Sequence, residues 1–557
     1  MPAAEGDATE LSLELFHPTL QRWFREQVGT PTDAQATAWP HIAANEHVLV
    51  TAPTESGKTL TAFLWALNQL ITGQWPEGHT SVLYVSPLRA LNNDIRRNLL
   101  TPLEQLAQYF EADGIPFPVI RPMTRSGDTP PEDRRRMLRQ PPEILITTPE
   151  SLNLLLSSKG GRGMLGSLQS VILDEIHAVV GSKRGVHLIT AVDRLVRLSG
   201  DFQRIALSAT VRPLDRMAEF VGGLHRDSEG RRPRQVQIVE STTSKEYDVR
   251  VRFPQTAIDQ AEDDDSVWPA LVEVFKEIIN NNRSTLVFAN ARRLCEKLTL
   301  MLNDGHERPL AYAHHGSLSR EIREVVETRL KAGELKAIVA TNSLEMGIDI
   351  GALDEVVLAQ SPPSISSAIQ RVGRAGHQVG VVSRATLFPT YSHDFLEAAV
   401  LAERLYAHDI EAIRPIEGAL DVLCQIIISM VGTEDWEVDD LYDEICLSFP
   451  YRHLNRRQFD LVIDMLAGRY AGSRIHELRP RLTFDRLRWH GGSAQGGHAG
   501  PLYVWRHDTR SWIVPHAPRR VQRHDRRVGR RIRLGVLRRT VFHTWHPELD
   551  HSQHHPQ

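Results

Sequence analysis

A short apolar strand, a glycine–lysine loop and a long apolar helix constrain the fold of this chain more than any other feature. Val48–Thr51 is apolar, Ala52–Thr59 reads APTESGKT, and Leu60–Ile71 is mostly apolar. The spacing matches a Walker A loop, in which backbone N–H groups and a helix N-terminus surround a β-phosphate. Lys58 would contact the β- and γ-phosphate oxygens, and the Thr59 hydroxyl would ligate Mg²⁺. The segment predicts a nucleotide-binding α/β domain, with a chance turn before a helix as the alternative.

One position of this loop departs from the usual pattern. Glu55 stands where related loops have glycine, and a carboxylate repels a triphosphate. Two interpretations remain open: Glu55 faces solvent with an ordinary backbone conformation, or the loop binds nucleotide weakly. We expect the nucleotide-binding loop to comprise Thr54, Glu55, Ser56, Gly57, Lys58 and Thr59.

Short apolar strands alternate with amphipathic helices in two blocks. Strands of this kind, apolar on both faces, are typical of buried parallel sheets, so each block predicts one doubly wound α/β domain. The acidic run Glu262–Asp265 lies between the blocks and indicates an exposed linker. The expected strands are Val48–Thr51, Val82–Val85, Ile144–Thr147, Val171–Leu173 and Ile205–Leu207, then Thr285–Phe288, Ala337–Ala340, Glu355–Leu358 and Ala385–Phe388.

Two adjacent carboxylates, Asp174 and Glu175, directly follow the strand Val171–Leu173. A carboxylate pair at the carboxyl end of a parallel strand suits metal-dependent phosphoryl transfer. Asp174 would bind Mg²⁺ through water, and Glu175 would orient and deprotonate the attacking water. A solvated turn is the alternative for the pair alone, but the Walker loop in the same block favours a catalytic role.

With these two elements the sequence resembles the DExH-type helicases of superfamily 2. The resemblance implies that ATP and Mg²⁺ are the cofactors and that Gln35 reads adenine. The remaining motifs occur in family order: Pro31–Gln35 (the Q motif), Ser86–Leu91 (Ia), Thr147–Glu150 (Ib), Ser208–Thr210 (III), Leu286–Asn290 (IV), Ala340–Asp349 (V) and Gln370–His377 (VI).

The sequence is most similar to the large helicase-related, or Lhr-type, family. The similarity rests on Trp39–Pro40, Gly181–Leu188, His314–Ser319 and the QRVGRAGH of motif VI, and it spans roughly Leu15–Arg486. The resemblance implies two RecA-like domains, a winged helix and a further DNA-binding domain. It also implies ATP-driven 3′-to-5′ movement on single-stranded DNA and unwinding of DNA or RNA–DNA duplexes in DNA repair. The alternative is a nucleic-acid-binding remnant whose ATPase is weakened by Glu55 and by the loss of the last domain.

Motif VI would supply groups from the second domain to the nucleotide. The resemblance implies that Arg374 is an arginine finger for the γ-phosphate. Gln370 would contact the water or phosphate, and Asp349 would read the ribose or hold the closed state. Arg371 would bind nucleotide or tie the motif to the cleft, with a surface ion pair as its alternative.

Coupling of hydrolysis to strand binding is expected at Ser208 and Thr210, because small hydroxyls can rearrange their hydrogen bonds with His177 as domains close. A strand-end turn is the alternative for this tripeptide alone. Loops at the sheet edges would hold the phosphate backbone without reading sequence. The expected contacts, with a solvated surface role as the alternative for the basic ones, are Arg89, Arg125, Thr148, Lys183, Arg184 and Ser343.

The pattern changes after about Tyr391. Three amphipathic helices without apolar strands between them predict a winged-helix-like module, at Ala419–Met430, Val438–Leu447 and Arg457–Leu466. From Arg486 onward the chain has 14 arginines, no lysine and four acidic residues. We interpret this tail as the product of a frameshift near Arg486, with an arginine-rich tail that binds nucleic acid as the alternative.

Length and composition exclude several classes of protein. A chain of 557 residues exceeds one hydrophobic core, and 41% hydrophobic with 24% charged residues argues against a disordered or fibrous chain. Three widely spaced cysteines argue against a thiolate metal site and favour a reducing, cytoplasmic location. We expect no membrane span and no small-molecule substrate besides ATP. The expected domains are residues 1–240 and 241–395 (RecA-like), 396–475 (winged helix) and 476–557 (the start of a DNA-binding domain, then a disordered basic tail).

Overall fold

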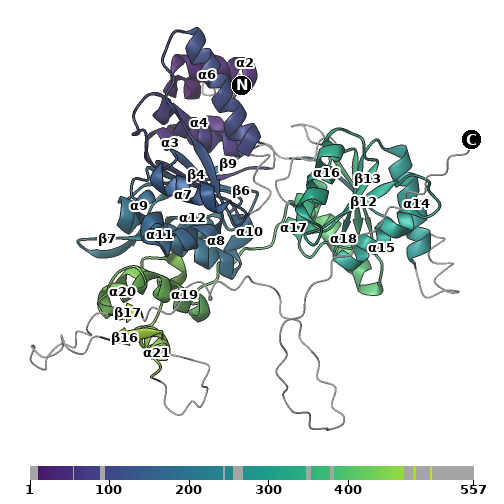
Figure 1. Cartoon of the computed structure of the whole chain (residues 1–557). Helices are drawn as coiled ribbons and strands as arrows, with labels where there is room; N and C mark the ends of the chain where they lie inside the picture. The colour runs from purple at the N-terminus through teal and green to yellow at the C-terminus, as the bar shows by residue number, and fades with distance from the viewer. Residues whose placement is uncertain are drawn as a thin grey trace, which may run out of the picture. The chain divides into compact units, whose positions relative to one another are not determined.

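The computed structural model describes residues 10–53, 56–87, 95–242, 245–254, 267–345, 353–376, 382–469, 481–484 and 502–504. Within them, two parallel sheets with helices on both faces are followed by a small helical module (Figure 1). The predicted α/β class is therefore confirmed. Four expected site residues lie outside the described ranges: Thr54, Glu55, Arg89 and Asp349.

The first sheet has seven strands, all parallel. They are β1 (His47–Thr51), β2 (Val82–Val85), β3 (Pro122–Arg125), β4 (Ile144–Thr147), β5 (Ser170–Leu173), β6 (Gln203–Ser208) and β9 (Val236–Glu240). Their order is β3-β4-β2-β5-β6-β1-β9, so β5, β6 and β1 lie side by side at the centre. An antiparallel hairpin, β7 (Leu224–Asp227) with β8 (Gly230–Pro233), lies outside this sheet.

Helices bury both faces of the first sheet, because alternate strand residues point to opposite sides. Val48 and Val50 join the core under α2, α3, α4 and α6, whereas Leu49 joins the core under α8 to α12. The helices are η1 (Ser12–Leu15), α2 (Pro18–Gln27), α3 (Asp33–Ala43), α4 (Lys58–Ile71), η2 (Arg96–Leu100), α6 (Thr101–Ala112), α7 (Pro131–Arg139), α8 (Pro149–Leu156), α9 (Lys159–Met164), α10 (His177–Val180), α11 (Lys183–Ser199) and α12 (Leu214–Gly222).

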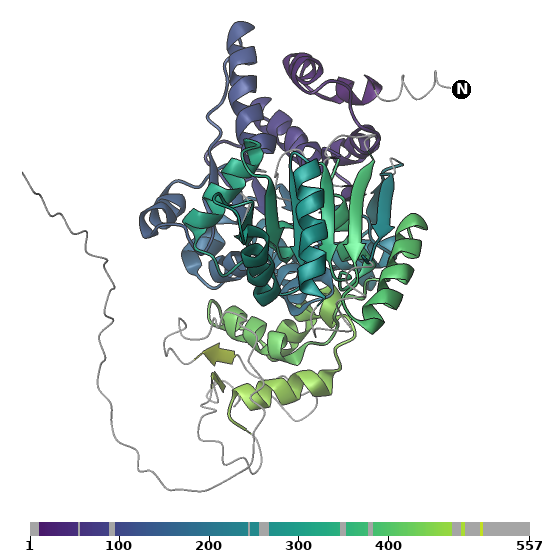
Figure 2. The same cartoon turned by 90° about the vertical axis from the view of Figure 1, so that its right-hand side faces the viewer.

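The second sheet has six parallel strands in the order β10-β15-β14-β11-β13-β12. Figure 2 shows these strands, in teal and green, with helices lying across them. Helices α16 to α18 pack on one face, and α14 and α15 pack on the other. The elements are β10 (Tyr247–Val251), α14 (Trp268–Asn281), β11 (Thr285–Ala289), α15 (Arg292–Asn303), β12 (Ala311–His314), α16 (Arg320–Lys331), β13 (Ala337–Ala340), η3 (Asn342–Leu344), β14 (Glu355–Ala359), α17 (Ile365–Val372), β15 (Ser383–Phe388) and α18 (Ser392–Tyr406).

All nine strands predicted from the sequence are present, but the four edge strands were missed. β3 and β9 border the first sheet, and β10 and β12 border the second. Each of the four has half-buried or exposed positions, whereas central strands such as β2, β4 and β5 are buried throughout. An edge strand is covered less completely, so it does not need the continuous apolar run that identifies a central strand.

The helical module contains the three predicted helices. They are α19 (Leu420–Val431), α20 (Val438–Ile445) and α21 (Arg456–Leu466), with the short turn η4 (Phe449–Tyr451) and the antiparallel pair β16 (Leu482–Phe484) and β17 (Leu502–Val504). The second helix ends two residues earlier than predicted, at Ile445. The module is packed on the first domain: Val186 of α11 belongs to the module's core, and Phe449 belongs to the core under α8 to α12.

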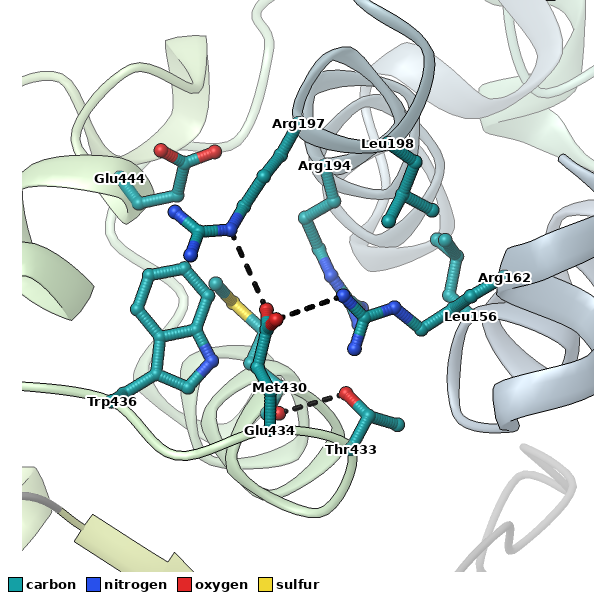
Figure 3. Close-up of a pocket in the computed structure, with 10 residues that line it drawn as sticks. All are labelled: Leu156, Arg162, Arg194, Arg197, Leu198, Met430, Thr433, Glu434, Trp436 and Glu444. Carbon is teal, nitrogen blue, oxygen red and sulfur yellow. Dashed lines mark hydrogen bonds and ion pairs between the residues drawn. The ribbon is translucent and has the colours of Figure 1, made fainter. Parts of the chain in front are cut away.

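A small cavity marks the contact between the module and the first domain (Figure 3). Glu434 pairs with Arg162 at 3.1 Å and with Arg197 at 3.5 Å, and the Arg197 guanidinium lies 4.2 Å from the centre of the Trp436 ring. Burial lowers the pKa of Arg194, a further lining residue, to about 10. The cavity volume of about 20 Å³ suits a single water molecule and is far too small for a nucleotide. The cavity is therefore part of the interface between the module and the first domain.

Within the described ranges, no helix has both the length and the apolar character that crossing a bilayer requires. Those same residues contain no group of three or more His, Cys, Asp or Glu side chains placed to hold a metal ion.

Candidate nucleotide site and strand-binding edge

The Q motif lies directly against the Walker loop. Thr32 and Gln35 form a capping box at the start of α3, which fixes both side chains. The Thr32 hydroxyl donates to the Ser56 carbonyl at 3.2 Å, and the Gln35 amide donates to the Gly57 carbonyl at 3.5 Å. Gly57 has φ +77°, and a Cβ there would lie 2.7 Å from Gln35 Nε2. The left-handed backbone therefore favours glycine at this position, and a side chain there would displace the Gln35 amide.

The Walker lysine begins α4 and is buried in the loop. Its ammonium donates to the carbonyls of Ala52 and Pro53, the latter at 2.8 Å. Burial lowers the pKa of Lys58, whereas the Glu175 and Asp174 carboxylates raise it, and the balance is a lowered pKa. The lysine thus faces both carboxylates that the sequence assigned to the same reaction.

The carboxyl ends of β1, β5 and β6 meet at one edge of the sheet, so the motifs that follow these strands converge there. Asp174 Oδ2 lies 3.4 Å from Thr59 Oγ1, and Asp174 Oδ1 accepts a hydrogen bond from the Glu175 backbone N–H at 2.8 Å. Burial, followed by the charge of Glu175, raises the pKa of Asp174 to about 6. A hydroxyl and a carboxylate oxygen at this separation fit the oxygen-only ligand preference of Mg²⁺.

Tyr84 is a site residue that the sequence analysis missed. It lies on β2, paired with Ile172 of β5, and its hydroxyl donates to Asp174 Oδ2. Its ring stacks on Phe63 of α4, 4.9 Å between ring centres. The available signal was a hydroxyl in an otherwise apolar central strand, because a buried hydroxyl usually has a partner.

His177 connects Glu175 to motif III. Its Nδ1 accepts from the Ala209 backbone N–H at 3.1 Å and lies 3.4 Å from the Ser208 hydroxyl. Burial lowers the pKa of His177 to about 4, so the ring is neutral at pH 7 and its proton resides on Nε2. Nε2 lies 3.2 Å from Glu175 Oε2 and donates to it. The expected partnership of Ser208 with His177 is present, and the half-buried Thr210 follows Ala209 at the end of motif III.

Arg371 ties motif VI to motifs IV and V inside the second domain. It donates to Glu345 Oε2 at 3.1 Å and to Asn290 Oδ1 at 2.8 Å, and its guanidinium lies 5.2 Å from the centre of the Phe288 ring. Its side chain is 4% exposed. The alternative of a surface ion pair for Arg371 is therefore wrong. This buried arginine connects motif VI to motifs IV and V inside the second domain.

Gln370 and Arg374 lie one helical turn apart at the end of α17. Arg374 Nε donates to the Gln370 carbonyl at 3.4 Å, and both residues are buried. The assignment of these two side chains to the nucleotide stays a prediction.

Several expected strand contacts share one edge of the first sheet, because β3, β4 and β2 are parallel neighbours. Arg125 ends β3, and Thr148 follows β4 as the N-cap of α8. Arg184 donates to the carbonyl of Pro87, beyond β2, at 2.9 Å and to Glu150 at 2.7 Å. This edge therefore presents a threonine and two arginines from segments far apart in sequence.

The other two described candidates, like Arg184, have protein partners. Lys183 pairs with Asp421 of α19 at 2.6 Å, which connects the first domain to the helical module. Ser343 Oγ lies 2.9 Å from His314 Nδ1 in the second domain. A role of either residue on a nucleic-acid strand stays a prediction.

Comparison with protein families assigns this arrangement. Residues 32–217 match the DEAD/DEAH box helicase model, and residues 270–378 match the helicase conserved C-terminal domain. Residues 403–495 match the winged helix domain of the large helicase-related protein. The chain belongs to the Lhr-type helicases. The fold class of two RecA-like domains and a winged helix is thereby confirmed.

Curated Lhr-type relatives cover most of the chain. The Lhr helicase/uracil glycosylase of Escherichia coli is 38% identical over 536 residues, which cover 87% of this chain and 34% of the relative. The ATP-dependent helicase Lhr-Core of Methanothermobacter thermautotrophicus is 39% identical, and the match covers 90% of this chain and 58% of that relative. The solved structure of Mycobacterium smegmatis helicase Lhr bound to ssDNA and AMP-PNP is 42% identical with a TM-score of 0.78, covering 89% of this chain and 61% of that one. The chain thus spans between a third and about three fifths of these Lhr-type proteins.

The Lhr-type similarity continues beyond Arg486, where we expected it to stop. The winged-helix match ends at residue 495, beyond Arg486. Further along, Leu502 of β17 pairs with Phe484 of β16, so part of the tail takes part in strand pairing. The frameshift interpretation and its basic-tail alternative both stay predictions.

Proposed function

We propose that this chain is an ATP-dependent helicase or translocase that moves 3′ to 5′ on single-stranded DNA and separates DNA or RNA–DNA duplexes. The observation that carries the proposal is the convergence of Lys58, Thr59, Asp174 and Glu175 on one sheet edge. The M. smegmatis relative was solved with ssDNA and AMP-PNP, which supports the same classes of ligand here. A role in DNA repair in the cytoplasm completes the proposal, and the three unpaired cysteines support a reducing compartment.

The Walker loop would hold the triphosphate. Lys58 would exchange its loop carbonyls for β- and γ-phosphate oxygens, while backbone N–H groups from Thr54 to Thr59 would surround the β-phosphate. Gln35 would read the adenine from the adjoining Q motif. Thr59 and Asp174 would hold Mg²⁺, whose charge neutralises phosphate oxygens.

Glu175 would accept the proton of the attacking water. Its carboxylate is held by the Nε2–H of His177, and its backbone has φ 48°, a left-handed conformation that is uncommon for a residue with a side chain. A carboxylate held by a hydrogen bond keeps its oxygen in one place, which is what a general base requires.

The second domain would complete the site when it closes. Arg374 would donate to charge developing on the γ-phosphate, a contribution typically worth about 10³ to 10⁵ in rate. Gln370 would contact the water or phosphate, and Asp349 would read the ribose. Arg371 would hold motif VI in register through Glu345.

Strand binding and coupling would use the neighbouring sheet edge. Rearrangement of the Ser208–His177–Glu175 contacts, with Thr210 beside them, would transmit the state of the nucleotide to loops that hold the strand. Those loops would contact phosphates through Arg89, Arg125, Thr148, Lys183, Arg184 and Ser343.

The test is ATP hydrolysis with and without single-stranded DNA. We expect the DNA to stimulate hydrolysis, and Lys58→Ala and Glu175→Gln each to reduce the stimulated rate by about 10²-fold or more. Lys276→Ala is the matched control, because Lys276 pairs with Glu273 on α14. A basal rate that DNA does not change would favour the rival, a nucleic-acid-binding remnant limited by Glu55.

A further inference from the structure

A buried histidine in the second domain joins a helix to motif V. His314 ends β12 and is 1% exposed. Its Nε2 lies 3.0 Å from Glu327 Oε1 of α16, and its Nδ1 lies 2.9 Å from the hydroxyl of Ser343 in η3. One imidazole therefore spans two segments that the sequence separates, and both ring nitrogens are engaged.

The sheet register places Ser343 beside this ring. His314 pairs with Ala340 of β13, and Thr341 donates its backbone N–H to the His314 carbonyl at 3.2 Å. The chain then turns into η3, which places Ser343 Oγ 3.0 Å from that same carbonyl. The hydroxyl thus has two neighbours on one residue, the carbonyl oxygen and Nδ1, and its position is determined by His314.

The chemistry of the three groups gives this arrangement a direction. The Glu327 carboxylate accepts a hydrogen bond from the Nε2–H of His314. With a proton on Nδ1 as well, the ring donates to a lone pair of Ser343 Oγ. The hydroxyl proton, which is directed at the His314 carbonyl in this structure, is then available to a different acceptor. A phosphate oxygen is such an acceptor.

We infer that His314 is a positioning residue that aims the Ser343 hydroxyl at a phosphate of the bound strand, with Glu327 holding the imidazole. The inference rests on the proposed function, in which Ser343 contacts nucleic acid. His314 itself contacts no phosphate; its effect passes through Ser343 alone.

Two substitutions separate positioning from simple packing. The side-chain amide of His314→Asn lies near the place of Nδ1, so it keeps the contact with Ser343 and loses Glu327. The longer His314→Gln has its amide near the place of Nε2, so it keeps Glu327 and loses Ser343. If His314 positions Ser343, asparagine should preserve DNA binding and glutamine should not. If His314 only anchors α16 through Glu327, glutamine should preserve DNA binding and asparagine should not.

The readout is the concentration of single-stranded DNA that half-maximally stimulates ATP hydrolysis, with kcat measured at saturating DNA. We expect Ser343→Ala and His314→Gln each to raise that concentration about tenfold, as for the loss of one hydrogen bond to a charged group, with kcat changed less than about twofold. His314→Asn should stay within about threefold of wild type. The double variant Ser343→Ala/His314→Gln should be no weaker than either single variant, because both remove one interaction.

The adjacent residue supplies the control. His315 also pairs with a glutamate: its Nε2 lies 2.5 Å from Glu296 Oε1. It is buried like His314, with 5% of its surface exposed. His315→Gln should leave the DNA concentration unchanged. Three outcomes would overturn the inference. The DNA requirement could rise equally for His314→Asn and His314→Gln, or rise more for His314→Asn than for His314→Gln. The increases of the two single variants could also add in the double variant. A wild-type chain that neither binds DNA nor responds to it would overturn the proposed function as well.

Discussion

The Tyr84 hydroxyl of β2 donates a hydrogen bond to the Asp174 carboxylate at the end of β5. Thr59 Oγ1 approaches the same oxygen, so two hydroxyls from different segments hold the proposed Mg²⁺ ligand. The hydrogen bond from Tyr84 also lowers the pKa of Asp174, against the larger effects of burial and of Glu175. Tyr84 thus helps to keep this carboxylate both placed and ionised.

Replacing Tyr84 with phenylalanine should weaken Mg²⁺ binding at Asp174 without abolishing it. The ring and its stacking on Phe63 remain, but Asp174 loses one hydrogen bond, worth about 1 kcal/mol. We expect the Mg²⁺ concentration for half-maximal ATP hydrolysis to rise about fivefold. Tyr109→Phe is the control, because that hydroxyl donates to Glu26 on the surface. An unchanged or lower Mg²⁺ requirement for Tyr84→Phe would contradict this role.

Gly57→Ala should abolish tight nucleotide binding. The substitution introduces a side chain at φ +77° and places its Cβ 2.7 Å from Gln35 Nε2, so the backbone is strained and the Gln35 amide must move away. We expect the Kd for a non-hydrolysable ATP analogue to rise more than about tenfold in equilibrium binding. Gly73→Ala controls for the cost of a left-handed backbone alone, because Gly73 has φ +70° and open space around it. Equal losses for both variants would show that the Gln35 contact is unimportant.

The stability of the first domain should fall as the pH drops below neutral. Burial lowers the pKa of His47 and of His177 from 6.5 to about 4. Between these values the two histidines bind more protons in the unfolded chain than in the folded one. Their contribution to the free energy of unfolding is therefore fully present above pH 6.5 and is lost as the pH falls toward 4. The slope should approach about 1.4 kcal/mol per pH unit for each histidine. Below pH 6 the raised pKa of Asp174 acts in the opposite direction and offsets about one histidine.

Urea unfolding of the first domain at pH 7, 6, 5 and 4.5 measures this slope. His47→Asn should flatten it, because asparagine keeps an acceptor for the Arg204 backbone N–H, which His47 Nδ1 accepts at 3.1 Å, and does not titrate. A slope identical to that of wild type would exclude His47 as a contributor.

Phe449→Ala should loosen the helical module from the first domain. Phe449 is 1% exposed and lies 5.6 Å, ring centre to ring centre, from Phe220 of α12. Truncating a buried phenylalanine costs about 3 to 5 kcal/mol. We expect a lower Tm and faster proteolysis between α18 and α19. Leu461→Ala is the control, because Leu461 is 60% exposed on α21. A wild-type cleavage pattern for Phe449→Ala would mean that this contact does not hold the module.

The frameshift interpretation of the tail predicts that removing residues 505–557 leaves DNA binding intact. Those residues contain 12 arginines. A tail that neutralised phosphates would steepen the salt dependence of binding, because each phosphate contact releases counterions. We expect the dependence of log Kd on log salt concentration to be unchanged by the truncation. A shallower dependence, by several units, would support the basic-tail alternative.

Sequence reasoning identified the central strands and the order of the motifs, because these follow from local rules. A buried parallel strand must be apolar on both faces, and a Walker loop needs its strand and helix at fixed spacing. Since the carboxyl ends of neighbouring parallel strands meet, the convergence of Lys58 with Asp174 could be foreseen from the alternation of strands and helices alone. Edge strands such as β3 and β12 escaped detection because partial burial relaxes the requirement for apolar residues.

By itself, the sequence determined the two α/β domains, the helical module and which residues we propose for the nucleotide site. Only the tertiary structure decided which side chains contact the proposed functional residues: Tyr84 contacts Asp174, Glu345 contacts Arg371, and His314 contacts Ser343. Each pair joins residues that are far apart along the chain, and no periodicity links them. Their contacts follow from strand order, register and helix packing, which arise when the whole core is assembled.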